Sequence, residues 1–105
     1  MLTEQATIHI CNQLYEALKK CQDRDEFKSL KRNLSRIEGI LGDHGYTIYN
    51  PINESYDETR TDCEATIAGE ISQNLRITDV IKPIITGDAG QRIIQKGVVI
   101  VTGKA

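Results

Sequence analysis

The sequence has little of what small catalytic or metal-binding proteins depend on. Its 105 residues contain no Trp, one Phe, two Pro, two His and three Cys. Cys11, Cys21 and Cys63 are odd in number and lack the paired spacing of a zinc knuckle, so we interpret them as small hydrophobes or bystanders. His9 and His44 have no Cys, His or carboxylate neighbours at ligand spacing. We therefore expect no metal site and no cofactor.

Charge of one sign is not concentrated anywhere in the chain. Its 13 Lys and Arg are spread among 15 Asp and Glu, for a formal net charge of -2. Acidic residues at 23–26 and Glu38 offset the basic residues at 28–36, which favours a solvated helix face over a nucleic-acid patch. No run approaches about 18 apolar residues, and Met1 does not begin a signal sequence. We expect a cytoplasmic protein that binds neither nucleic acid nor membrane.

The first 42 residues contain no Pro and have apolar residues at helical intervals. Thr3 is the expected N-cap of a first helix, because it precedes good helix formers. The wide apolar face of that helix consists of Ile8, Cys11, Tyr15 and Leu18, with Ile10, Leu14 and Cys21 beside them. A polar break at 23–26 is where a second helix can begin, with Asp23 or Asp25 as its cap. The segment 42–45, which contains two Gly, should end it.

The second helix carries the clearest periodic signal in the chain. Its apolar residues follow one another at spacings of three and four, the a/d pattern of a coiled-coil seam: Phe27, Leu30, Leu34, Ile37 and Leu41. Burial of these side chains does not offset the entropy lost when an isolated helix is ordered, and a pair of helices makes only a thin core. We therefore predict that residues 1–42 are a dimerisation segment that forms a four-helix bundle in a homodimer.

After Gly45 the pattern changes to that of strands. Alternating or β-branched stretches predict strands at 46–49, 64–68, 75–81 and 91–102. Loops are expected at 51–62, at 69–74 and at 86–90, the last as the hairpin loop between the last two strands. Pro83 should limit the strand before it to an edge or a bend, because proline cannot donate to a ladder. The predicted fold class is α+β, a helical hairpin followed by a small, mostly-β domain at 43–105.

The sequence offers few groups for catalysis. The only Gly-rich loop, 87–90, lacks the Gly-Lys-Ser/Thr ending of a P-loop and precedes a strand pattern, which favours a hairpin loop over a phosphate cradle in a small enzyme. Acidic residues at Glu54, Asp57, Glu58, Asp62 and Glu64 could pair as acid and base. Nothing in the sequence indicates a pocket that would shift their pKa values. We do not expect an enzyme.

The order of these elements resembles the C-terminal two-thirds of GrpE, the nucleotide exchange factor of DnaK-type chaperones. The similarity covers residues 27–103. The corresponding positions are Leu41, Gly45-Tyr46-Thr47-Ile48, Pro51, Asn53-Glu54, Tyr56-Asp57-Glu58, Ile77 to Ile81, Gly87 to Gly90, Arg92-Ile93-Ile94-Gln95 and Val99-Ile100-Val101. The chain departs from the family at Thr61-Asp62-Cys63, where the family has His-Glu-Ala, and at Gln95, where it has an arginine. The long paired helix that precedes the family's bundle has no counterpart.

This resemblance implies a co-chaperone that binds the ATPase domain of a DnaK-type chaperone and promotes ADP release. Such a factor prefers the open form of its partner, so nucleotide affinity falls by reciprocal coupling. The contact residues that the resemblance implies are Ile81, Arg92 and Val101, although Ile81 and Val101 could equally belong to the core. Without the long helix, the resemblance implies the core exchange function alone. The departures leave open an alternative, a dimeric scaffold of the same fold without exchange activity.

Overall fold

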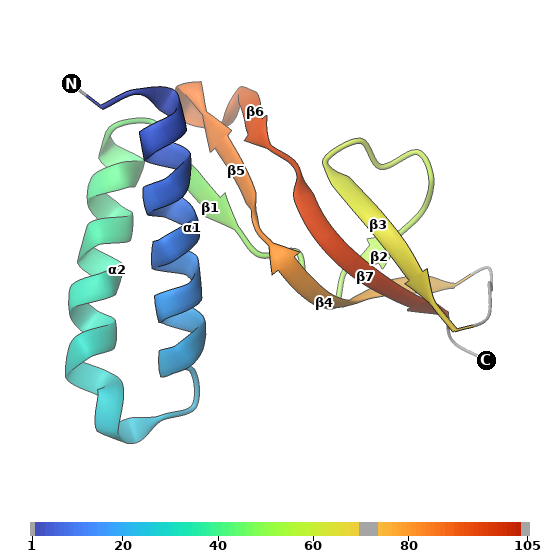
Figure 1. Ribbon diagram of the computed structural model, residues 1–105, viewed down its shortest axis with the longest axis horizontal. Coiled ribbons are helices and arrows are strands. Elements are labelled where there is room, and N and C mark those ends of the chain that lie inside the picture. Colours follow the sequence, from blue (N-terminus) through green and yellow to red (C-terminus); the bar gives the residue numbers. More distant parts are fainter. Residues whose placement is uncertain (1, 70–73, 104–105) are drawn as a thin grey trace. The chain divides into compact units, whose positions relative to one another are not determined.

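The structure is a computed structural model that describes residues 2–69 and 74–103 (Figure 1). Its elements are α1 (Glu4–Cys21), η1 (Asp25–Phe27), α2 (Lys28–Asp43), β1 (Thr47–Tyr49), β2 (Ser55–Tyr56), β3 (Cys63–Ala68), β4 (Leu75–Lys82), β5 (Ile84–Gly87), η2 (Asp88–Gly90), β6 (Arg92–Gln95) and β7 (Gly97–Gly103). Two helices followed by two sheets confirm the α+β class. Most of the predicted loop at 69–74 lies outside the described residues.

The described chain forms two compact units. The helical unit contains the residues up to Ile48 together with Ile85–Ile94. The β unit contains Tyr49–Ile84 together with the residues from Gln95 onward. Strand residues from late in the chain therefore belong to the same unit as the helices.

Helix α1 begins at the predicted cap. The hydroxyl of Thr3 accepts a hydrogen bond from the backbone N–H of Ala6 at 3.0 Å, which satisfies one of the free donors at the helix start. The backbone N–H and the hydroxyl of Thr7 both donate to the carbonyl oxygen of Thr3 at 3.0 Å. The buried residues of α1 are Thr7, Cys11, Leu14, Tyr15 and Cys21. Four of the seven residues of the predicted apolar face are therefore buried, whereas Ile8 and Leu18 are half-buried and Ile10 is exposed. Thr7, whose hydroxyl is satisfied locally, is buried in addition.

The connection between the helices differs from the prediction. Neither Asp23 nor Asp25 caps α2; the residue before η1 is Arg24, the residue before α2 is Phe27, and neither makes a side-chain cap hydrogen bond. Asp23 instead occupies the turn, in the left-handed region with φ of 60°. The backbone N–H of Phe27 donates to the carbonyl oxygen of Arg24 at 3.0 Å. A 3₁₀ turn thus supplies backbone partners where a side-chain cap was expected.

Helix α2 ends where the sequence predicts. Gly45 follows it with φ of +88°, a conformation that glycine adopts without steric cost. The backbone N–H groups of His44 and Tyr46 donate to the carbonyl oxygen of Leu41 at 3.1 and 2.9 Å. These bonds satisfy a carbonyl at the helix end and direct the chain into β1.

The helical unit also contains a small sheet with the strand order β1-β5-β6. Ile85 is fully buried there. The turn η2 joins β5 to β6, and the backbone N–H of Ala89 donates to the carbonyl oxygen of Gly45 at 3.1 Å. The Gly-rich segment is therefore a hairpin turn, as predicted, but the strand before it is β5, which was not predicted and which contains Thr86 and Gly87.

The β unit contains a four-stranded sheet with the order β2-β4-β7-β3. Strand β7 pairs antiparallel with β4 and parallel with β3, and neither the parallel pairing nor the short strand β2 was predicted. Ile77 lies opposite Val101, and Val80 lies opposite Val99. The buried residues of this unit include Pro51, Cys63, Ile77, Val80, Pro83, Ile84, Val99 and Val101.

The predicted continuous strand at 91–102 is wrong. The chain leaves strand conformation at Lys96, and the two halves belong to different sheets. Pro83 interrupts the earlier strands in the same way, between β4 and β5, and the side-chain amide of Gln95 donates to its carbonyl oxygen at 2.9 Å. Proline therefore marks a bend, one of the two predicted alternatives. β4 is not an edge strand, because it has β2 and β7 as neighbours.

Candidate functional site

Four of the five residues predicted to form the dimer seam lie on α2, and Phe27 ends η1 directly before it. We refer to the five as the hairpin face: Phe27, Leu30, Leu34, Ile37 and Leu41. Helix α2 has no buried residue. Leu30 is 49% exposed and Ile37 is 43% exposed, while the other three are half-buried. Ile40, which the sequence reasoning left out, is 57% exposed. Packing within the chain therefore leaves much of this apolar helix surface in contact with water.

Helices α1 and α2 lie side by side and run in opposite directions (Figure 1). The buried residues of the pair all come from α1. Isolated exposed aliphatic residues are common on protein surfaces, whereas several on one helix face indicate an interaction site. The hairpin face is thus the strongest candidate surface for protein binding in the helical unit.

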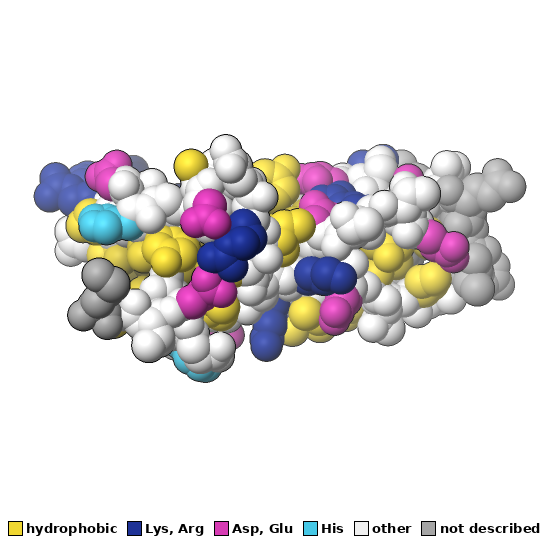
Figure 2. Space-filling model, turned by 90° about the horizontal axis from the view of Figure 1, so that it is seen from above, with side chains coloured by type: hydrophobic (Ala, Val, Ile, Leu, Met, Phe, Trp, Pro, Cys, Tyr) yellow, Lys and Arg dark blue, Asp and Glu magenta, His cyan; other side chains and the backbone are white. Residues whose placement is uncertain are grey.

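Arg92 is engaged by residues of its own unit. Its guanidinium donates from Nη2 to Oε2 of Glu4 at 2.6 Å and from Nε to Oδ2 of Asp88 at 2.9 Å. The hydrogen bond from Arg92 lowers the pKa of Glu4 below its ordinary value. Basic side chains lie against acidic ones elsewhere on the surface drawn in Figure 2. The Arg92 side chain is still half-exposed, so a partner could contact it, but only while it stays ion-paired with Glu4 and Asp88.

Ile81 and Val101, the other two residues implied by the resemblance, lie in the β unit and have opposite environments. Ile81 on β4 is 53% exposed, which a partner could cover. Val101 on β7 is fully buried opposite Ile77. A side chain in that position cannot touch a partner while the sheet is intact. Of the three residues, Ile81 and Arg92 reach the surface and Val101 does not.

A cluster that sequence reasoning missed organises the polar segment 51–62. Arg60 donates to Oδ1 of Asp62 at 2.6 Å, to Oε1 of Glu54 at 2.9 Å and to the carbonyl oxygen of Ser55 at 3.1 Å. The hydroxyl of Tyr49 donates to the other oxygen of Glu54, which raises the pKa of Tyr49. The side chain of Arg60 is only 18% exposed. The sequence feature that could have indicated this cluster is a single arginine within an acidic loop.

The described cysteine and histidine side chains have local surroundings that the structure defines. Burial raises the pKa values of the Cys11 and Cys63 thiols, which makes the nucleophilic thiolate scarcer. His9 is hydrogen-bonded to the amide of Gln5, and His44 to the carbonyl oxygen of Ile40. Within residues 2–69 and 74–103, no group of three or more His, Cys, Asp or Glu side chains could hold a metal ion. Neither helix in this part of the chain is long and apolar enough to cross a bilayer.

No model of a protein family matches the chain, and no curated protein or solved structure is significantly similar to it.

Proposed function

We propose that the chain is a homodimeric, GrpE-like co-chaperone. In this proposal residues 1–42 form a four-helix bundle with a second copy, and residues 43–105 bind the ATPase domain of a DnaK-type chaperone in the cytoplasm and promote ADP release. The observation that carries the proposal is the uncovered hairpin face on α2, followed in the chain by two small sheets. This is the arrangement that the resemblance to GrpE requires.

The dimer follows from the packing of the helices. A pair of antiparallel helices has one buried side, whereas four helices surround a complete core. A second copy placed on the hairpin face would remove Ile37 and the neighbouring Ile40 from water, and burial of each aliphatic side chain is favourable by about 1.5 to 3 kcal/mol. The symmetric arrangement of two copies would use the same face on both chains.

Exchange activity needs no bond chemistry, which suits a chain whose thiols are buried and whose histidines are exposed. It requires only that the protein bind the open, nucleotide-free form of its partner more tightly than the closed form. The surface residues that can make such contacts are Ile81 and Arg92. Val101 would act indirectly, because it lies opposite Ile77 in the same sheet that carries Ile81 and stabilises that sheet from its buried side.

Stopped-flow release of a fluorescent ADP from a DnaK-type ATPase domain tests this function. We expect the wild-type protein to accelerate release, and Ile81→Ser and Arg92→Ala to reduce the acceleration without unfolding the protein. Lys96→Ala is the matched control, because Lys96 is an exposed cation outside the proposed contacts. Undiminished acceleration by Arg92→Ala would remove Arg92 from the interface, and no acceleration by the wild type would reject the exchange activity.

A second candidate is a dimeric scaffold of the same fold without exchange activity. Two observations favour it: Arg92 is held by Glu4 and Asp88, and Val101 is buried. Both observations reduce the surface with which the protein could contact the ATPase domain during nucleotide exchange. A scaffold would bind the ATPase domain, or another partner, with no change in the rate of nucleotide release.

A further inference from the structure

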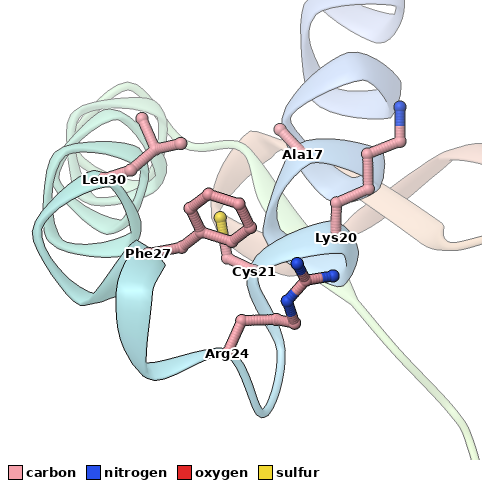
Figure 3. A pocket seen from close by; sticks show the side chains of 6 residues that line it. All are labelled: Ala17, Lys20, Cys21, Arg24, Phe27 and Leu30. Atoms are coloured by element: carbon pink, nitrogen blue, oxygen red, sulfur yellow. The ribbon is translucent and has the colours of Figure 1, made fainter.

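A pocket of about 520 Å³ lies at the end of the helical hairpin, where α1 passes through η1 into α2 (Figure 3). Its lining residues are Ala17, Lys20, Cys21, Arg24, Phe27 and Leu30. Ligand pockets in proteins have volumes of about 300 to 1,000 Å³ and combine apolar walls with a few polar groups. The hairpin pocket has both properties.

The walls of the pocket are apolar and come from both sides of the hairpin. In Figure 3 the Phe27 ring lies between Leu30 of α2 and the side chains of α1. The sulfur of Cys21 lies behind the ring, and Ala17 continues the wall along α1. An aliphatic or aromatic group could fill this space and remove the Phe27 and Leu30 side chains from water.

The polar groups of the pocket are both cations. The guanidinium carbon of Arg24 lies 5.0 Å from the centre of the Phe27 ring, a cation–π contact that holds it at the pocket. Glu26 accepts a hydrogen bond from Nε of Arg24 at 2.8 Å, which leaves the two Nη groups without a partner among the described residues. The ammonium of Lys20 likewise has no partner in that part of the chain.

The charged side chains that line the pocket are both positive. They are Lys20 and Arg24, whereas the whole segment 17–30 is nearly balanced, with four Lys and Arg and three Asp and Glu. The two lining cations favour an anion in the pocket.

We propose that the hairpin pocket binds a small amphipathic carboxylate, with its hydrocarbon part against Phe27 and Leu30 and its carboxylate on Lys20 and Arg24. An uncharged molecule of the same shape would lose the two charge-assisted contacts, and an amphipathic amine would be repelled by them. The site includes neither Ile81 nor Arg92 and does not depend on the proposed exchange activity. It shares Phe27 and Leu30 with the hairpin face, so it requires that a second copy leave this end of the face open.

Isothermal titration calorimetry of the full chain with octanoate tests the site. We expect saturable binding of octanoate, with octan-1-ol weaker and octylammonium weaker still. Lys20→Gln should reduce the affinity about three- to tenfold, because it removes one partly exposed ionic contact. Lys28→Gln is the matched control, because Lys28 is an exposed cation nearby that does not line the pocket, and it should bind octanoate as the wild type does.

Other outcomes would overturn the proposal. Equal affinity for octanoate and octan-1-ol would show that the cations contribute nothing. Unchanged octanoate affinity in Lys20→Gln would show that octanoate binds outside the pocket. In that case Ala17→Leu, which narrows the pocket, would also leave the affinity unchanged. Binding to the Ile37→Asp variant but not to the wild type would show that a second copy fills the pocket. Circular dichroism of each variant establishes that a loss of binding is not a loss of fold.

Discussion

The guanidinium of Arg92 donates two hydrogen bonds to the carboxylate of Glu4, a residue 88 positions earlier in the chain, at 2.6 and 3.3 Å. This pair joins the first turn of α1 to the beginning of β6, within one compact unit. A third hydrogen bond from Arg92 reaches Asp88 in the turn before it. One side chain thus connects the hairpin turn to the start of the protein.

This ion pair predicts a dependence of stability on pH. Arg92 lowers the pKa of Glu4 from its ordinary 4.5 in the folded state. A group with a lowered folded-state pKa stabilises the fold above its unfolded-state pKa, and this contribution is lost as the pH falls through the folded-state value. We therefore expect the stability difference between the wild type and Glu4→Gln to shrink below about pH 4.5, as measured by urea unfolding at several pH values.

Arg92→Gln provides the control for this dependence. In that background Glu4 has no guanidinium partner, so Glu4→Gln should have little further effect at any pH. Equal effects of Glu4→Gln with and without Arg92 would contradict the coupling between the two residues.

The local elements of this fold could be predicted because the residues that define them are neighbours in sequence. Thr3 caps α1 through Ala6, and Gly45 ends α2 with a positive φ. The seam on α2 has a helical period that is visible without any knowledge of its surroundings. The prediction of an aspartate cap for α2 was wrong because a 3₁₀ turn can begin at the same position, and a capped helix and a 3₁₀ turn have similar sequences there.

The long-range features could not be predicted, because periodicity indicates which side chains are buried but not what covers them. Nothing local distinguishes a β7 that pairs parallel with β3 from one that pairs antiparallel. The β-branched pattern around Val101 suits either a core or a contact surface, and only the pairing of the strands shows that Val101 is buried. The partners of Arg60 and Arg92 are likewise set by the fold. Sequence therefore located the hairpin face but not the two arginine clusters.

The hairpin face gives a prediction about oligomeric state. Ile37→Asp places a carboxylate on a side chain that is 43% exposed in the single chain, so the fold of each copy should tolerate it. In the proposed dimer the same charge would be buried without a partner. We expect the dissociation constant of the dimer to rise about 100-fold, as measured by light scattering over a range of protein concentrations. Leu34→Asp should have the same effect.

Ser35→Asp is the control for this experiment. Ser35 is exposed on α2 but lies outside the hairpin face, so the variant adds the same charge next to Leu34 and should remain dimeric. A monomeric wild-type protein would reject the bundle, and dissociation by Ser35→Asp would show a general effect of charge.

Arg60 gives a prediction about the polar loop. Arg60→Ala removes its contacts to Asp62, Glu54 and the backbone of Ser55, and leaves two carboxylates without their partner. We expect the free energy of unfolding to fall by about 1 to 3 kcal/mol in urea titrations, with Arg60→Lys intermediate because an ammonium cannot reproduce the fork of contacts. Arg24→Ala, which removes a well-exposed ion pair, should change stability little.

The close approach of β7 to its neighbours gives the last prediction. A Cβ atom added at Gly97 would lie 3.0 Å from Cγ1 of Ile84 and 3.3 Å from Sγ of Cys63, both buried. Gly97→Ala should therefore lower the free energy of unfolding by about 1 to 3 kcal/mol, as overpacking does. Gly39 in α2 has no atom within 4 Å of an added Cβ, so Gly39→Ala should raise it by about 0.5 to 1 kcal/mol through helix propensity. Urea unfolding of the two variants should give changes of opposite sign. Stabilisation by Gly97→Ala would mean that β7 does not pack between Ile84 and Cys63 as described.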